Sequence, residues 1–161
     1  MKDKQNIFVP WDLEVEQTAD YHKRKEYLSV LEGDYVKNTT EAFRVFNINS
    51  QQRSTANVPG FTNLVVWCPY EEGTDWRNTL SNNGTILSEE YKGKSNNKSS
   101  KAPDNIEEKR IVFLKGKNVL GQMIARFVGV FKFDRMDNNV GIWKRVSYYC
   151  DMRCLFQYDA I

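Results

Sequence analysis

The sequence predicts a mainly β fold with one substantial helix near the N-terminus, arranged as a curved, largely antiparallel sheet or a small barrel. The clearest evidence is the stretch from Gln122 to Asp134, which alternates with period two and is rich in β-branched and aromatic residues. Similar stretches elsewhere raise the expected total to about five to seven strands. With 161 residues, the chain has room for a single domain around one core.

The N-terminal part divides into an arm and a helix. Residues 1–18 contain a short apolar piece interrupted by Pro10 and are expected to form an arm. From Ala19 to Val36, apolar residues at Tyr27, Leu28 and Leu31 follow helical spacing, which predicts a helix that ends near Gly33.

Strands are expected over most of the remaining chain. Turn residues separate them at Asn82–Gly84, Gly116–Asn118 and Met136–Gly141. The segment Lys92–Asn105 is rich in Ser, Asn and Lys and is expected to be a mobile surface loop. The expected strands are Ala42–Asn49, Phe61–Cys68, Thr85–Ser88, Arg110–Lys115, Gln122–Asp134 and Ile142–Asp151.

The strand from Gln122 to Asp134 carries two residues that its core role does not explain. Strict alternation places Phe127, Phe131 and Phe133 on one face, as sheet core. Arg126, in the middle of an apolar strand, needs a partner or a wet cavity. Gly129 is typical of a bend or a close backbone approach.

The composition limits which binding partners and which cellular compartment are expected. A net charge of +2 is too small to indicate a polyanion partner, so any nucleic-acid binding depends on local clusters of charge. The three cysteines and the lone His22 match no familiar zinc spacing, and reduced thiols in a cytoplasmic protein are the better interpretation. Neither a signal peptide nor a membrane span is predicted. We therefore expect no metal, no cofactor and no membrane partner.

Catalysis has little support in the sequence. His22 has no neighbouring catalytic signature, and no phosphate-binding glycine motif is present. The acidic pairs Glu71–Glu72 and Glu89–Glu90 allow a metal-dependent nuclease. Adjacent strand residues point to opposite faces, however, which favours a solvated edge over a shared metal.

A binding site for a planar ligand fits better. Aromatic residues concentrate near the segment from Thr74 to Asn78, beside polar side chains that can read the edge of a nucleobase. Each tryptophan also has an ordinary alternative as a core residue. The proposed base pocket consists of Trp67, Tyr70, Asp75, Trp76, Arg77, Asn78, Arg126 and Trp143. The proposed phosphate contacts are Lys92, Lys94, Lys144 and Arg145.

Two stretches resemble a known family. Asp75–Ile86 and the pattern RIVF…ARFVGVF resemble segments of SRA-like domains that are fused to bacterial HNH restriction endonucleases, and the resemblance covers roughly residues 60–150. It implies a PUA-like β-barrel that reads modified DNA by flipping a base into a pocket. In that pocket Asp75, Trp76, Arg77 and Asn78 would line or support the base, and Arg126 would face it from a strand.

Three functions follow in order of preference. The first is a non-catalytic module that binds double-stranded, modified DNA as the specificity part of a restriction or defence system, with cutting left to a nuclease domain or subunit. The second is a small protein-binding module, such as a phage-encoded inhibitor of host defence. The third is the metal-dependent nuclease.

Overall fold

The computed structural model describes residues 29–31, 35–49, 53–94 and 98–151. Eight strands form one open, mixed sheet in the order β3-β4-β7-β8-β9-β6-β5, with β2 paired to β8 outside this path. All pairings in this sheet are antiparallel except the parallel pair β4–β7. The strands are β2 Tyr35–Val36, β3 Thr55–Asn57, β4 Leu64–Trp67, β5 Trp76–Ser81, β6 Ile86–Tyr91, β7 Lys109–Lys117, β8 Met123–Asp137 and β9 Val140–Ser147.

The mainly β class is therefore confirmed, and the expected strands at 61–68, 85–88, 110–115 and 122–134 are present as β4, β6, β7 and β8. The expected strand Ile142–Asp151 is divided into β9 and the short β10, Tyr149–Asp151. β10 pairs with β1, Ser29–Leu31, in a separate two-stranded sheet. No helix in the described part of the chain is long and apolar enough to cross a membrane.

The helix lies at a different place from the expected one. The prediction of a helix over Ala19–Val36 is wrong where it can be checked, because β1 and β2 occupy its C-terminal part, and residues 1–28 lie outside the described residues. The predicted strand Ala42–Asn49 is also wrong, because the helix α3, Thr39–Val45, occupies its first half. The arm at 1–18 lies wholly outside the described residues.

Capping explains why α3 begins at Thr39. The side chain of Asn38 accepts a hydrogen bond from the Glu41 backbone N–H (2.9 Å), and the Glu41 carboxylate accepts one from the Lys37 backbone N–H (2.8 Å). These reciprocal bonds satisfy donors that a helix start would otherwise leave unpaired. The helix then buries Ala42 and Phe43.

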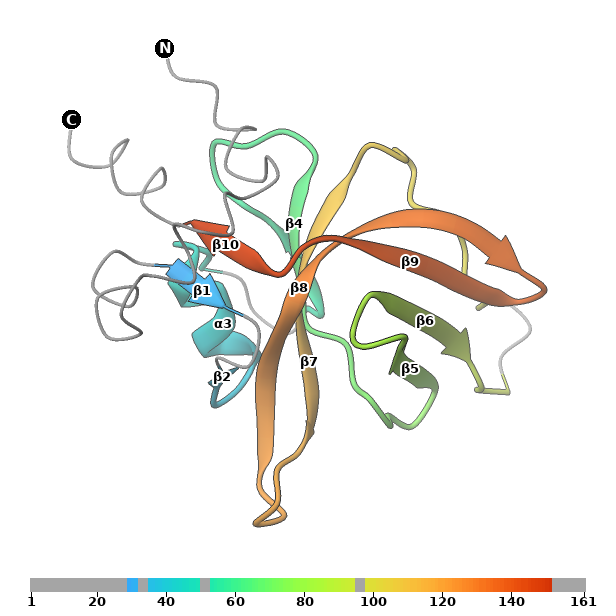
Figure 1. Ribbon diagram of the computed structural model, residues 1–161, viewed down its shortest axis with the longest axis horizontal. Coiled ribbons are helices and arrows are strands. Elements are labelled where there is room, and N and C mark those ends of the chain that lie inside the picture. Colours follow the sequence, from blue (N-terminus) through green and yellow to red (C-terminus); the bar gives the residue numbers. More distant parts are fainter. Residues whose placement is uncertain (1–28, 32–34, 50–52, 95–97, 152–161) are drawn as a thin grey trace.

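The core lies on both faces of the sheet. One cluster packs α3 against the strands, including Phe43, Phe113 and Phe127, and the other gathers Trp67, Trp143 and Phe131 on the opposite face. Figure 1 shows α3 beside β2 at one end, β5 and β6 at the other, and the β7–β8 hairpin projecting beyond the sheet.

The strict alternation predicted for β8 is wrong at Gly129. Phe127 belongs to one core cluster, whereas Phe131 and Phe133 pack in the other. The pairing with β7 shifts register between Val112 and Phe113, opposite Gly129 and Phe127, and Gly129 has a φ of 136°. A bulge of this kind changes the face on which later side chains lie.

Candidate functional site

Three neighbouring strands, β5, β6 and β9, build a layered face that carries most of the candidate chemistry. Residues directly opposite each other in antiparallel strands lie on the same face, so the register defines the layers. They form an apolar row of Leu80, Leu87 and Trp143, a polar row of Asn78, Glu89 and Gly141, and an aromatic row of Trp76 and Tyr91. We call this side of the three strands the inner face.

The polar row buries hydrogen-bonding groups that its own strands do not satisfy. Asn78 is 1% exposed; its amide Nδ2 donates to the Tyr70 carbonyl (2.8 Å), but its Oδ1 atom has no partner. Such buried unpaired atoms are rare in folded proteins and require an explanation. Asn78 therefore presents an unused acceptor.

Glu89 lies opposite Asn78 in the same row. Burial raises the pKa of its carboxyl group, while the charge of Arg110 and a hydrogen bond from Ser100 lower it. The Ser100 hydroxyl donates to Glu89 Oε1 at 3.3 Å. Gly141 allows this approach, since a Cβ atom at its position would lie 2.8 Å from Ser100 Oγ.

Trp143 supplies a donor at the edge of this polar group. Its indole Nε1 has no hydrogen-bond partner, and a Cβ atom on Gly141 would lie 3.6 Å from it. The Trp143 ring stacks near Trp67, with 5.4 Å between centroids. Above both rings lies the Arg110 guanidinium, 4.4 Å and 5.0 Å from their centroids, which also pairs with Glu108 at 2.7 Å.

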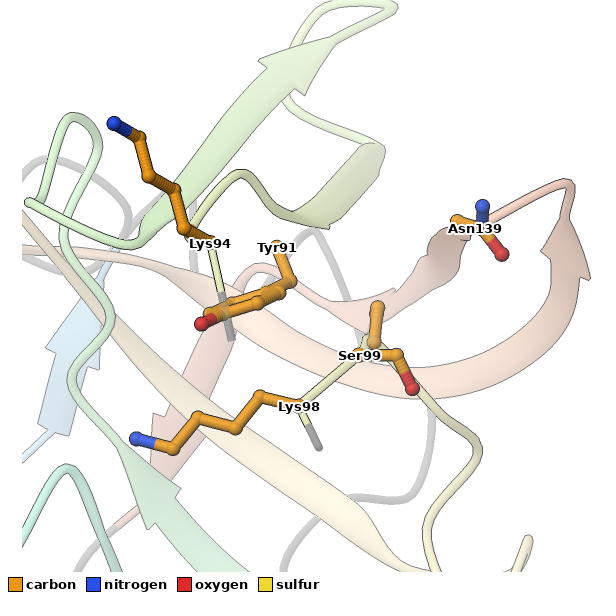
Figure 2. Close-up of a pocket in the computed structure, with 7 residues that line it drawn as sticks. Tyr91, Lys94, Lys98, Ser99 and Asn139 are labelled. Atoms are coloured by element: carbon orange, nitrogen blue, oxygen red, sulfur yellow. The ribbon is translucent and has the colours of Figure 1, made fainter. Parts of the chain in front are cut away.

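A pocket of about 300 Å³ lies at the aromatic end of the inner face. Ser100 is part of its lining and donates a hydrogen bond to Glu89, so this residue links the pocket to the polar row. Figure 2 shows the Tyr91 ring between the side chains of Lys94 and Lys98, with Ser99 and Asn139 on the other side. The lining residues are Tyr91, Gly93, Lys94, Lys98, Ser99, Ser100 and Asn139.

Some sequence-predicted residues meet at this site. Trp76 lies against Tyr91 with 4.9 Å between ring centroids, Asn78 lies in the polar row, and Lys94 lines the pocket. Trp67 and Trp143 are buried in the second core cluster, where their rings already contact other aromatic or cationic groups. Trp67 and Trp143 therefore form part of the core beneath the site.

Other predicted residues form the rim of β5. Arg77 and Lys92 both pair with Glu72, at 2.6 Å and 2.8 Å, and the Asp75 carbonyl accepts a hydrogen bond from the Lys92 backbone N–H. These side chains are held by one another on the outer edge of the sheet.

The remaining predicted residues lie elsewhere. Tyr70 is exposed and packs against the Lys115 ammonium, and Arg126 is exposed on β8, where it pairs with Tyr35 of β2. Lys144 pairs with Asp134 at 3.7 Å. Arg145 donates to the Val128 carbonyl at 3.3 Å. The structure does not bring these four residues into the pocket.

Sequence reasoning missed Tyr91, Ser100 and Asn139, and it interpreted Glu89 only as one of an acidic pair. The expectation that Glu89 and Glu90 point to opposite faces is confirmed by the register and by their environments, since the Glu90 carboxylate is exposed and lies 3.9 Å from Arg77. The sequence signal that could have identified Glu89 is the alternation of faces along the strand, which places Glu89 on the same face as the apolar Leu87. No group of three or more His, Cys, Asp or Glu side chains within the described ranges could hold a metal ion.

Comparisons with known proteins identify relatives of the fold. The family model described as the SET and RING associated domain, SRA, matches residues 20–152. The solved structure of the 5-hydroxymethylcytosine-specific restriction enzyme AbaSI is similar with a TM-score of 0.61 and 24% identity, over 88% of this chain and 47% of that one. This chain thus spans about half the length of AbaSI.

A second solved structure shows a weaker likeness. The DNA recognition domain of the cytosine modification-dependent restriction endonuclease LpnPI has a TM-score of 0.40 and 10% identity, over 73% of this chain and 72% of that one. A search of curated protein sequences finds no match.

Proposed function

The chain belongs to the SRA domain family, and from this premise we propose that it is a DNA-binding module that reads a modified, flipped base for a restriction or defence system. The observation that carries the proposal is the pair of buried polar atoms without a partner behind the pocket, Asn78 Oδ1 and Trp143 Nε1, beside the half-buried Glu89 carboxyl. An inserted ligand with a complementary edge would satisfy them.

A cytosine edge suits these groups. Its N4 amino group donates hydrogen bonds, for which Glu89 and Asn78 Oδ1 provide acceptors, and its ring carbonyl accepts them, for which Trp143 Nε1 provides a donor. The name of AbaSI specifies 5-hydroxymethylcytosine as the base that enzyme recognises, which supports testing cytosine derivatives first. We propose that Asn78, Glu89 and Ser100 read the base edge.

Aromatic and basic groups at the pocket complete the proposed site. The ring of Tyr91, supported by Trp76, can stack on a base, a contact worth about 1–3 kcal/mol. Lys94 and Lys98 lie where they can contact the phosphates that flank a flipped nucleotide. This assignment keeps Trp76, Asn78, Trp143 and Lys94 from the sequence prediction and adds Tyr91, Glu89, Ser100 and Lys98.

The chain is proposed to bind DNA without cutting it, in the cytoplasm. A nuclease domain or subunit would perform the cleavage. A plasmid-cleavage assay with this chain and magnesium or manganese checks this point: intact plasmid supports a binding role, and cleavage contradicts it.

Binding to modified DNA is tested by fluorescence anisotropy with labelled duplexes that carry cytosine, 5-methylcytosine or 5-hydroxymethylcytosine at one position. We expect tighter binding to one modified duplex. Glu89→Gln should weaken binding to all three duplexes by about 1–3 kcal/mol, because the substitution removes a carboxylate acceptor for the N4 amino group that the three bases share. Glu90→Gln is the matched control, since Glu90 lies next in sequence but on the outer face, and it should keep the wild-type affinity.

The outcomes separate the alternatives. Equal binding of all duplexes by the wild type would contradict base reading. No binding to any duplex would contradict the DNA-binding function, and a stable protein complex recovered in a pull-down would then favour a protein-binding module. An unchanged affinity of the Glu89→Gln variant for all three duplexes would remove Glu89 from the base contact.

A further inference from the structure

Arg110 carries a largely buried positive charge that the proposed base contacts do not use. Arg110 lies on β7, and its side chain is 17% exposed. Its guanidinium carbon lies 4.4 Å from the centroid of the Trp143 ring and 5.0 Å from that of Trp67. Removing a charge from water costs free energy that only well-placed partners recover. The groups around Arg110 therefore decide what its charge does.

One ion pair and two aromatic rings hold the guanidinium. Its Nε atom donates to Glu108 Oε2 at 2.7 Å, and the Glu108 side chain is 20% exposed. The faces of the Trp67 and Trp143 rings also attract a cation. An uncharged side chain of similar volume would fill the space between the rings without the cost of desolvation. Packing alone therefore does not account for a charge at this position.

Trp143 connects Arg110 to the polar row. It lies on β9 two residues after Gly141, which is the register partner of Glu89. The indole Nε1 lies close to this row, since a Cβ atom on Gly141 would be 3.6 Å from it. Burial raises the pKa of the Glu89 carboxyl, and the charge of Arg110 lowers it. The guanidinium on the Trp143 ring thus acts on the carboxyl from the β7 side.

The groups directly opposite Glu89 are neutral. They are Asn78 on β5 and Gly141 on β9, and the Ser100 hydroxyl donates to Glu89 at 3.3 Å. The charged side chains on the surrounding elements are Arg77 and Glu90 on the outer face, Lys94 and Lys98 at the pocket, Glu108 just before β7, and Arg110. Among these described side chains, Arg110 is the one whose charge lowers the pKa of Glu89.

We propose that Arg110 is a positioning residue for base binding, which holds the Glu89 carboxyl in its charged form and the Trp143 indole beside the polar row. This inference rests on the proposed function, in which Glu89 accepts a hydrogen bond from the N4 amino group of a cytosine. A carboxylate offers only acceptors, and a hydrogen bond to it is stronger than one to a neutral carboxyl. A protonated carboxyl would place a donor at an edge that already donates. The base contact therefore depends on a charge that Arg110 favours without touching the base.

The dependence of DNA affinity on pH tests this assignment. Fluorescence anisotropy with a duplex that the wild type binds gives the affinity at constant salt, from about pH 5 to about pH 8. The affinity should be constant at high pH and fall by up to about tenfold per pH unit once Glu89 takes up a proton. We call the pH at which this fall begins the onset pH. Glu89→Gln should lack the fall, and the titration of His22 cancels in the comparison because both proteins contain it.

Three variants separate the charge of Arg110 from its packing. Arg110→Gln removes the positive charge, so the carboxyl takes up a proton more readily and the onset should move to higher pH. Glu108→Gln removes the charge that partly neutralises Arg110, so the onset should move to lower pH. Arg110→Lys keeps the charge without the planar guanidinium and should keep the onset close to that of the wild type. Arg126→Gln is the matched control, because it removes an exposed charge on β8, and it should leave the onset unchanged.

The outcomes distinguish a positioning role from a purely structural one. Where Arg110→Gln folds, as judged by thermal unfolding, an onset at the wild-type pH overturns the inference. An Arg110→Lys onset displaced as far as that of Arg110→Gln overturns it as well. If Arg110→Gln does not fold, Glu108→Gln decides, and an unchanged or raised onset overturns the inference. Parallel profiles of the wild type and Glu89→Gln would also overturn it, while DNA binding and the proposed function stay in place. If the wild type binds no duplex, both proposals fail.

Discussion

Glu89 and Glu90 are adjacent in the sequence but have different environments, because successive strand residues face opposite sides of the sheet. Glu90 lies on the outer face, within 3.9 Å of Arg77, whereas Glu89 accepts a hydrogen bond from Ser100 and is half-buried. A buried carboxylate costs stability unless it is fully paired. Glu89 carries this energetic cost next to the proposed pocket. Carboxyl groups with shifted pKa values are typical of functional sites.

The buried position of Glu89 predicts how stability depends on pH. Burial raises the pKa of its carboxyl above the ordinary value of 4.5, so the folded state binds this proton more tightly than the unfolded state. The contribution of Glu89 to the free energy of unfolding therefore falls as pH rises from 4.5 through the raised pKa, and is constant above it. Glu89→Gln should lack this fall, so the variant gains stability relative to the wild type across that window.

Thermal unfolding of both proteins at a series of pH values measures the effect. Glu72 and Glu107 have lowered pKa values and lose stabilisation as pH falls, but they are present in both proteins and cancel in the difference. A difference in unfolding free energy that stays constant with pH would contradict the assignment.

Gly129 is the residue on which the path of β8 depends. Its φ of 136° is nearly restricted to glycine, and a Cβ atom would lie 2.9 Å from the Ser147 carbonyl oxygen and against the side chain of Arg145. Gly129→Ala should cost about 1–3 kcal/mol in backbone strain, and overpacking should add about 1–3 kcal/mol. Denaturant unfolding measures the loss.

Gly121→Ala provides the comparison for that measurement. Gly121 also has a positive φ, but a Cβ atom there would meet nothing within 4 Å, so only the conformational cost of about 1–2 kcal/mol is expected. If the two variants lose the same stability, the close approach at Gly129 is not what makes glycine necessary.

At the scale of elements, the sequence predicts strands better than it predicts their ends and faces. β4, β6, β7 and β8 were predictable because alternation and turn residues agree in them. β5 was missed, because its sequence WRNTLS contains little apolar alternation and its stability depends on pairing with β6. The helix α3 was misread as a strand, because AFRVF suits either period and the decisive signal was the cap formed by Asn38 and Glu41.

The candidate site was partly predictable for the same reason. Trp76 and Asn78 lie on β5 and Lys94 follows its partner β6, so their closeness in the sequence explains why the structure places them in one region. Ser100 and Asn139 could not be selected, since they reach the pocket only through the return of the chain along β6 and β9. Arg126 was placed in the pocket from a resemblance, whereas its strand partners lie on the hairpin side.

The lysines in the segment that follows β6 lead to a prediction about the salt dependence of DNA binding. Lys94 and Lys98 line the pocket. Each phosphate contact contributes about 0.9 to the magnitude of the slope of log affinity against log salt, and this contribution is lost when the contact is removed. Lys94→Ala/Lys98→Ala should therefore lower the magnitude of the slope by roughly 2 and weaken binding to all duplexes similarly. Titrations by anisotropy at several salt concentrations measure this slope.

Lys37→Ala is the control for the lysine pair. Lys37 is exposed next to α3, at the end of the sheet away from β5 and β6 (Figure 1), and its substitution should leave the slope unchanged. A slope equally affected by both variants would indicate diffuse electrostatic attraction instead of contacts at the pocket.

For the whole molecule, charge distribution matters more than total charge. The net charge of +2 gives weak attraction to nucleic acid, while basic residues concentrate on the β7–β8 hairpin and beside the pocket. Surface contacts of this kind are sequence-blind and are screened by salt, whereas hydrogen bonds within a buried pocket are screened much less. Affinity and specificity should therefore respond differently to salt.

This separation leads to a test of the complete proposal. Raising the salt from about 50 to about 200 mM should weaken binding to modified and unmodified duplexes together, while the ratio of the two affinities stays constant or increases. The reason is that contacts made inside the pocket, not the lysines, are proposed to distinguish the bases. Parallel titrations of both duplexes give the ratio at each concentration. A ratio that falls to one at the higher salt would show that the preference comes from surface charge, and the inner face would then have to be explained as structure alone.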